Sequence, residues 1–510
     1  MNIISGQLRN EREYRELSAS IKDQLSSRIP RPARMIGLCE GARNAMISAL
    51  IEDAGSKLKK KPMLLIVSDE KEAMRSYTAL SEMGHAPTVF SFRDYVFYNI
   101  TASHEYEHER LGVLISILDN SCDVVITTPD AALQYTIPAV KLEKSTMTIC
   151  SNDAIDMNFL KRFLVDSGYS MVEMVDGVGQ FSVRGGIIDI FPPGYEYPVR
   201  LELFGDDIDS MSFFDIISQR RTDSVDSVKI TPAREILTDS ETLEKLTRII
   251  SSQLKKVKDD RTVDILASEL EAIKAQSELR FVDKYISVVY PEKECLLNYF
   301  SRDSVVVCEE FSAISERIKS YEWHQKQEVT SLLEEGTISA ANADYGKWFD
   351  DFLYFIGSHA GVIADSFMSS ISELKFSSTF SIPTKQTVSY SENLDLLTED
   401  LNAYNKSGFS TVILCENEVM AKNLRNMIDG DRFAVPIIKP EELFPDKVST
   451  VITFGINITG FELTASKFAV MSTYPAGSSY SRSSITLKKR KGRKKTAQEK
   501  IMSYADLAAG

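Results

Sequence analysis

The stretch from residue 181 to 214, FSVRGGIIDIFPPGYEYPVRLELFGDDIDSMSFF, limits what this chain can fold into more than any other segment. Its two halves, separated by a Pro-Pro-Gly turn, alternate apolar and polar residues with the two-residue period of strands. In the second half one face carries three aliphatic side chains, and the other carries Arg200, Glu202 and Phe204. This pattern predicts an antiparallel sheet that packs one face on a core.

Phe204 breaks the polar character of the outer face. It is a large aromatic residue beside Arg200, and Arg184 lies on the polar face of the first half. Aromatic and arginine side chains together are typical of a protein-binding hot spot. The alternative is that a loop covers Phe204.

The motifs RGGIIDIFPPG, PVRLELFGDDID and FFDIISQRRT resemble the module shared by the excision-repair protein UvrB and the transcription-repair coupling factors. In that family the module is a small antiparallel domain whose exposed face docks the damage-recognition protein UvrA. The resemblance implies UvrA docking through Arg184 in SVRGG, Arg200 in PVR and Phe204 in LELF. Simple pairing of the arginines with nearby carboxylates, such as Glu202 and Asp206, is the alternative.

The composition is that of an ordinary folded protein of several domains, with 510 residues, 43% of them hydrophobic and 26% charged. The net charge of -14 argues against a general nucleic-acid binder. Six scattered cysteines without a C-x-x-C pair are typical of reduced core residues. No apolar run approaches the roughly 18 residues of a membrane span. We therefore expect a cytoplasmic protein without a membrane partner.

The order of predicted elements indicates an α/β fold class. The resemblance implies that the first domain is a degenerate helicase-like, P-loop-derived parallel-sheet domain. We expect an inserted small antiparallel α+β module within it, followed by a second small α/β domain. The expected limits are 1–145 and 234–370 for the split domain, 146–233 for the module, 371–390 for a linker, 391–478 for the second domain and 479–510 for a basic linker. Strands are predicted at 63–67, 89–92, 123–127, 304–308, 361–364, 411–415, 435–438, 448–454 and 468–471.

A segment before the first long helix has the position of a phosphate-binding loop, which reads G-x-x-x-x-G-K-[ST] when it works. Aligned from Gly37, the chain has Ala42 for the second glycine, Arg43 for the lysine and Asn44 for the hydroxyl residue. Glu40, beside Gly41, puts an anion where phosphates would sit. Alone, the segment reads as an ordinary helix start. Compared with UvrB, it resembles the same loop after the loss of its catalytic residues.

A strand at 304–308 ends in Glu309 and Glu310, where UvrB-like proteins carry an Asp-Glu pair. Carboxylates without the phosphate-binding lysine do not hold Mg-ATP productively. We expect no cofactor and no ATP hydrolysis in this chain. The family's motor, which uses ATP and Mg, is expected beyond Gly510.

The segment from His104 to His108 matches the zinc-protease pattern H-E-x-x-H. The remaining histidines offer no third ligand in a recognisable pattern. The extra Glu107, followed by Glu109 and Arg110, indicates a charged, solvated helix start. We expect no metal site, and a zinc metalloprotease is the least favoured function.

The run Lys488–Lys495 is too polar to fold alone. It is interpreted as a solvated linker, a weak contact to a DNA backbone, or a localisation-like signal. In the coupling factors a basic segment followed by a SYADL-like sequence introduces the RNA polymerase-binding domain. The resemblance thus implies RNA polymerase and DNA as partners of a missing C-terminal part.

The resemblance to the coupling factors thus implies a recruitment region for UvrA at stalled RNA polymerase rather than an enzyme. The full-length family members are ATP-driven DNA translocases. A UvrB-like protein that loads onto damaged DNA is the first alternative, and the altered loop at Gly37 speaks against it.

Overall fold

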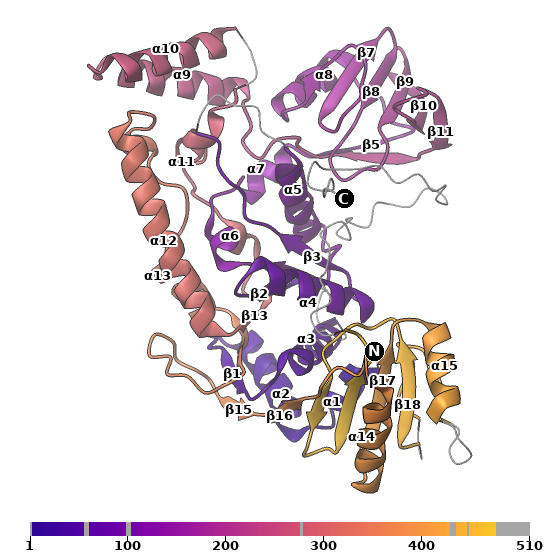
Figure 1. Ribbon diagram of the computed structural model, residues 1–510. Coiled ribbons are helices and arrows are strands. Elements are labelled where there is room, and N and C mark those ends of the chain that lie inside the picture. Colours follow the sequence, from indigo (N-terminus) through magenta and orange to yellow (C-terminus); the bar gives the residue numbers. More distant parts are fainter. Residues whose placement is uncertain are drawn as a thin grey trace, which may run out of the picture.

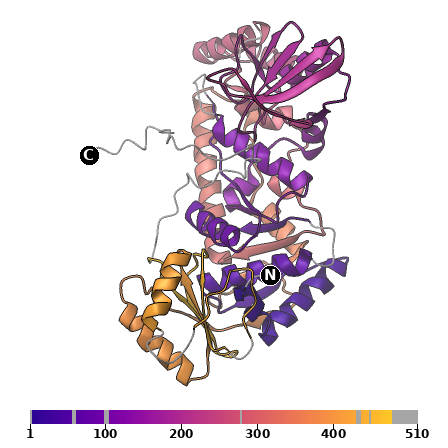
Figure 2. The ribbon, with the colours of Figure 1, turned by 90° about the vertical axis from the view of Figure 1, so that its right-hand side faces the viewer.

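The computed structural model describes residues 3–55, 61–97, 104–275, 279–428, 435–445 and 448–475. Within these residues the chain is elongated, with an antiparallel module at one end, a parallel sheet in the middle and a second α/β unit at the other end (Figure 2). The α/β fold class is confirmed. The domain limits expected from the sequence stay a prediction.

The central sheet has seven strands in the order β15-β1-β14-β13-β2-β4-β3, and all neighbouring strands are parallel. Parts of the chain before and after the module both supply strands, so the module is an insertion in this sheet (Figure 1). The strands are β1 Ala33–Ile36, β2 Met63–Ile66, β3 Pro87–Phe90, β4 Val124–Thr127, β13 Val305–Glu309, β14 Ala360–Asp365 and β15 Thr379–Ser381.

Both faces of this sheet are buried along its inner strands. Consecutive residues of these strands are apolar, and they point alternately to the two faces. In β13, Val306 and Cys308 belong to the core on one face, and Val305 and Val307 to the core on the other. The helices of the central unit are α1 Ile3–Leu8, α2 Arg12–Ser26, α3 Glu40–Gly55, α4 Glu70–Glu82, α5 Glu105–Leu118, α6 Pro129–Leu133, α7 Ala139–Lys144, α9 Ser240–Leu254, α10 Asp260–Lys274, α11 Ile286–Val289, α12 Phe311–Glu334 and α13 Phe349–Gly357.

The module is a six-stranded sheet in the order β11-β10-β9-β8-β7-β6 with a separate β5–β12 ribbon. Only the β6–β7 pair is parallel. Helix α8, Met157–Asp166, starts at Asp156, whose carboxylate accepts from the backbone of Asn158, and its apolar side helps close the core. The strands are β5 Met147–Cys150, β6 Ser170–Met171, β7 Gln180–Arg184, β8 Ile187–Ile190, β9 Val199–Phe204, β10 Asp207–Phe214, β11 Arg221–Ser224 and β12 Ser227–Ile230.

The second α/β unit shares a core with the central one. Its sheet has the order β16-β19-β20-β17-β18. Leu414 and Phe461 of this sheet pack in one continuous cluster with Met46 of α3 and Val307 of β13. Its elements are β16 Thr384–Gln386, α14 Leu394–Lys406, β17 Ser410–Cys415, α15 Glu418–Ile428, β18 Thr450–Phe454, β19 Phe461–Leu463 and β20 Phe468–Ser472.

The linker expected at 371–390 stays a prediction, like the other domain limits. This segment contains β15 and β16, which extend the central and the second sheet by backbone hydrogen bonds. One expected strand at this end of the chain was wrong. The strand expected at 435–438 is a single bridge between Ile437 and Ile452. Pro436 lacks the N–H that a longer ladder would need.

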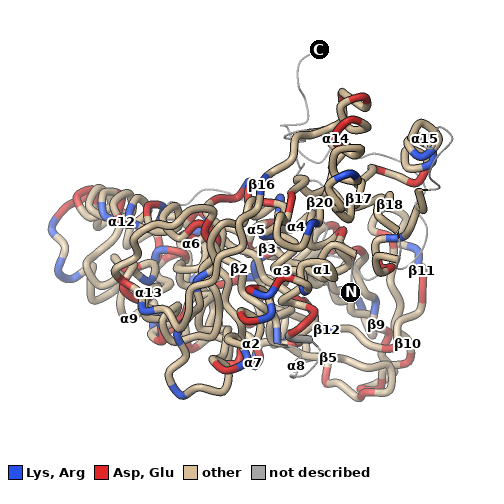
Figure 3. The backbone as a smooth tube through the Cα atoms, turned by 90° about the horizontal axis from the view of Figure 1, so that it is seen from below, with Lys and Arg blue, Asp and Glu red and all other residues tan. Residues whose placement is uncertain are grey.

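No helix among the described residues is long and apolar enough to cross a membrane. Seen from below, stretches of the backbone with acidic residues and stretches with basic residues are interspersed along the described part of the chain (Figure 3). The Lys488–Lys495 run lies outside the described residues.

Candidate functional site

The outer face of the module sheet carries the three side chains singled out in the sequence. The register pairs Arg184 of β7 with Ile187 of β8, and Ile187 with Glu202 of β9. Arg200 lies opposite Asp189 of β8. Antiparallel pairing therefore brings residues from three strands onto one face.

Phe204 is the most exposed part of this face. It ends β9, next to a turn in which Gly205 has a φ of +66°, and 84% of its surface is exposed. Since so large an apolar surface is in contact with water, no described loop covers Phe204. Such a side chain is available to a protein partner.

A single buried carboxylate links the two arginines. Arg200 donates from Nε to Asp189 Oδ1 at 2.6 Å and from Nη2 to Oδ2 at 2.9 Å. Arg184 donates from Nη2 to the same Oδ2 at 2.8 Å. The arginines are thus paired, but with Asp189 and not with Glu202 or Asp206. Glu202 is occupied instead by Arg221 and Ser210.

The two arginines differ in what they leave free. The Arg200 side chain is only 13% exposed, donates also to the backbone oxygen of Gln219 at 3.2 Å, and lies 4.5 Å from the ring centroid of Phe214. The hydrogen bond to Asp189 raises the pKa of the Arg200 guanidinium above the ordinary value for arginine. The Arg184 side chain is 51% exposed. Arg184 and Phe204 therefore form the accessible part of the face.

Sequence reasoning missed Asp189. The signal was present, since Ile187 and Asp189 alternate with Ile188 and Ile190 in β8. The identity of its partners depends on the register of two hairpins, which the alternation alone does not specify.

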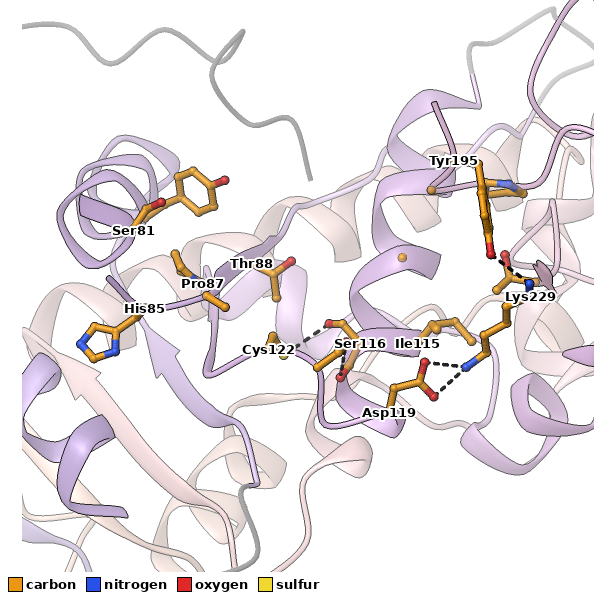
Figure 4. Close-up of a pocket in the computed structure, with 17 residues that line it drawn as sticks. Ser81, His85, Pro87, Thr88, Ile115, Ser116, Asp119, Cys122, Tyr195 and Lys229 are labelled. Carbon is orange, nitrogen blue, oxygen red and sulfur yellow. Dashed lines mark hydrogen bonds and ion pairs between the residues drawn. The ribbon is translucent and has the colours of Figure 1, made fainter. Parts of the chain in front are cut away.

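A pocket of about 280 Å³ lies where the module meets the central unit (Figure 4). Tyr195 and Lys229 of the module line it together with Asp119 and Cys122 of the central unit. Lys229 Nζ donates to Asp119 Oδ1 at 2.6 Å across the junction. The pocket lies at the end of β8 and β9 that carries the Pro-Pro-Gly turn, so it is remote from the turn at Gly205 that follows Phe204.

The segment compared with a phosphate-binding loop is a tight connection between β1 and α3. Gly37 has a φ of +92°, and α3 begins at Glu40. Ala42 and Asn44 are buried in α3. Glu40 forms an ion pair with Arg75, with 3.7 Å between Glu40 Oε2 and Arg75 Nη1.

Two later segments of the chain pack directly against this loop. The backbone N–H of Cys39 donates to Thr384 Oγ1 at 2.7 Å, and Thr384 N–H donates to the carbonyl of Gly37 at 2.9 Å. A Cβ added to Gly41 would lie 1.8 Å from the carbonyl oxygen of Thr459. Gly41 thus serves close packing of the second α/β unit against α3.

Arg43 is held by Glu309, the last residue of β13, and by Glu310, which follows it. Its Nη1 donates to Glu310 Oε1 at 2.6 Å and to Ser366 Oγ at 2.6 Å, and its Nε lies 3.5 Å from Glu309 Oε2. Burial raises the pKa of Glu309 to about 7, even though Arg43 acts in the opposite direction. The fold therefore brings Arg43, Glu309 and Glu310 together in one cluster, in which Arg43 forms an ion pair with each acidic residue.

The H-E-x-x-H segment begins α5 and takes part in packing. His108 Nε2 donates to the carbonyl oxygen of Ala233 at 2.9 Å, and burial lowers the His108 pKa to about 4. Glu107 is buried, and its carboxylate accepts from the backbone of Glu235 and from Arg234. The expectation of a solvated helix start is wrong for Glu107. No cluster of His, Cys, Asp and Glu suited to a metal ion is present in the described part of the chain.

Comparison with known proteins identifies the relatives of this chain. A family model for the UvrB interaction domain matches residues 147–236. A transcription-repair-coupling factor of Bacillus subtilis (strain 168) is 28% identical over 499 residues, which cover 93% of this chain and 40% of the relative. One from Staphylococcus aureus (strain USA300) is 25% identical over 491 residues, with the same coverage. The chain spans about two fifths of the length of the curated relatives it matches.

Proposed function

Because this chain is related over 93% of its length to transcription-repair-coupling factors and contains their UvrB interaction domain, we propose that it recruits UvrA to sites of stalled RNA polymerase. The contact with UvrA is the finer part of this proposal and follows from the resemblance of the module. For the whole protein we propose ATP-driven DNA translocation that displaces the polymerase, with both RNA polymerase and DNA as partners.

One observation carries the docking proposal: Phe204 and Arg184 are both exposed on the outer face of that domain, on strands β9 and β7, and Arg184 is anchored there to Asp189. Phe204 would enter an apolar pocket of UvrA, and the free nitrogens of Arg184 would donate to acidic groups around it. Loss of one such contact costs on the order of 1–3 kcal/mol of binding free energy.

A titration with purified UvrA tests the proposal. We expect the wild-type chain to bind and the Arg184→Ala/Phe204→Ala variant, which leaves Arg200 paired with the buried Asp189, to show no measurable binding, with circular dichroism spectra that match. Failure of the folded wild type to bind would refute UvrA docking and leave the fold assignment untouched.

We also propose that this chain does not hydrolyse ATP, which separates it from a UvrB-like loading protein. Support comes from the loop that follows β1. Its backbone N–H at Cys39 already donates to Thr384 Oγ1, and Arg43 is already paired with Glu309 and Glu310. A DNA-stimulated ATPase assay should give the same background rate for wild type and for Arg43→Ala. A wild-type rate that Arg43→Ala abolishes would favour the UvrB-like alternative.

A further inference from the structure

Asp189 has the environment of a residue that organises its neighbours. Its side chain is fully buried on the outer side of β8. Its two oxygens accept three hydrogen bonds, two from Arg200 and one from Arg184. A carboxylate buried in this way is stable only with such compensation.

The surroundings explain why Asp189 is buried on a face otherwise open to solvent. Ser182 and Ser212 flank the Asp189–Arg200 pair in the register, and their small side chains let the pair lie flat on the sheet. A small apolar cluster of Val175, Phe191 and Phe214 adjoins this row, and the Arg200 guanidinium stacks on Phe214. Arg200 is therefore fixed on several sides.

Arg184 has only one anchor. Its Nη2 is committed to Asp189, while its remaining nitrogens have no partner among the described residues. Without Asp189, the long Arg184 side chain would sample many rotamers in water and lose that conformational entropy on binding. Asp189 thus removes a cost of association before the partner arrives.

We propose that Asp189 is a positioning residue of the docking face: it aims Arg184 at the partner while Arg200 holds Asp189 in place. This inference rests on the proposed UvrA docking. Asp189 itself is buried and touches no partner. Arg200 then contributes mainly through Asp189, and Phe204 acts independently of both because it lies beyond this network.

Double-mutant cycles against UvrA distinguish positioning from a general structural role. Asp189→Asn keeps the shape of the side chain and removes its charge. We expect it to weaken UvrA binding about tenfold in the wild-type background and about tenfold in a Phe204→Ala background. In an Arg184→Ala background its effect should fall below about threefold, since no side chain remains to be aimed.

The outcomes of these cycles either support or overturn the positioning role of Asp189. Equal losses in all three backgrounds would overturn the positioning role, because distortion of the sheet affects every contact alike. Circular dichroism checks the fold of each variant. Should Asp189→Asn fail to fold, Arg200→Lys replaces it, since lysine keeps the charge but not the paired hydrogen bonds. A wild type that does not bind UvrA refutes the proposed function itself, whereas binding without coupling refutes only this inference.

Discussion

Replacing Phe204 by alanine should weaken UvrA binding by about 2 kcal/mol, or about 30-fold in Kd, and should leave stability unchanged. The side chain is 84% exposed, so truncation removes almost no packing within the module. The lost free energy would come from the apolar area that Phe204 buries in the complex. Calorimetric or fluorescence titration of wild type and variant with UvrA measures the change.

The chain offers a matched control for this variant. Phe367, in the loop that follows β14, is also 84% exposed. It lies on the central unit and not on the module. Phe367→Ala should bind UvrA as wild type does. Equal losses for Phe204→Ala and Phe367→Ala, or none for either, would contradict docking through the face that carries Phe204.

Replacing Glu235 by alanine should lower the free energy of unfolding by about 3–5 kcal/mol. Glu235 follows β12, the last strand of the module, and is buried. Its carboxylate accepts from Arg93 Nη1 at 2.8 Å and from Arg110 Nη2 at 3.0 Å. Truncation leaves the buried Arg110, which has no other carboxylate partner among the described residues, without its counter-charge. The midpoint of chemical unfolding at pH 7 measures the loss.

A pH series and a control variant test whether the loss of stability comes from the charge of Glu235. Burial alone would raise the Glu235 pKa, but Arg110 and Arg93 outweigh it and the pKa is lowered. The stabilisation is therefore present above the ordinary glutamate pKa of about 4.5 and is lost as pH falls below it. Glu244→Ala, at an exposed position of α9, should change little. An unchanged midpoint for Glu235→Ala would show that this network does not hold the module to the central sheet.

The alternation of side chains in the module was enough to predict which residues share the outer face. It predicted Arg184, Arg200 and Phe204 on one side of the sheet, where the structure has them. The alternation of apolar and polar residues indicates only which face of the sheet each side chain is on. It did not predict that Arg200 is mostly buried or that Asp189 is the common partner, since both depend on the register between β8 and β9 and on the cluster around Phe214.

Charged motifs were the least predictable features. Glu107 was expected in solvent because its neighbours are charged, yet it is buried against Arg234 and the backbone of Glu235. A run of charges in sequence does not reveal whether partners more than a hundred residues away will cover it. The buried network at the module junction thus follows from the insertion and not from the local pattern.

The sequence by itself determined the α/β class, the strand faces of the module and the absence of the phosphate-loop lysine, because these depend on residue type and local period. Only the tertiary structure decided what those residues do. It joined Arg43 to Glu310, 267 positions away, packed Thr459 against Gly41, and placed Asp189 beneath both arginines. The physical reason is that a charge or a close contact is neutralised by whatever the fold brings near it, and proximity in space is a property of the whole chain.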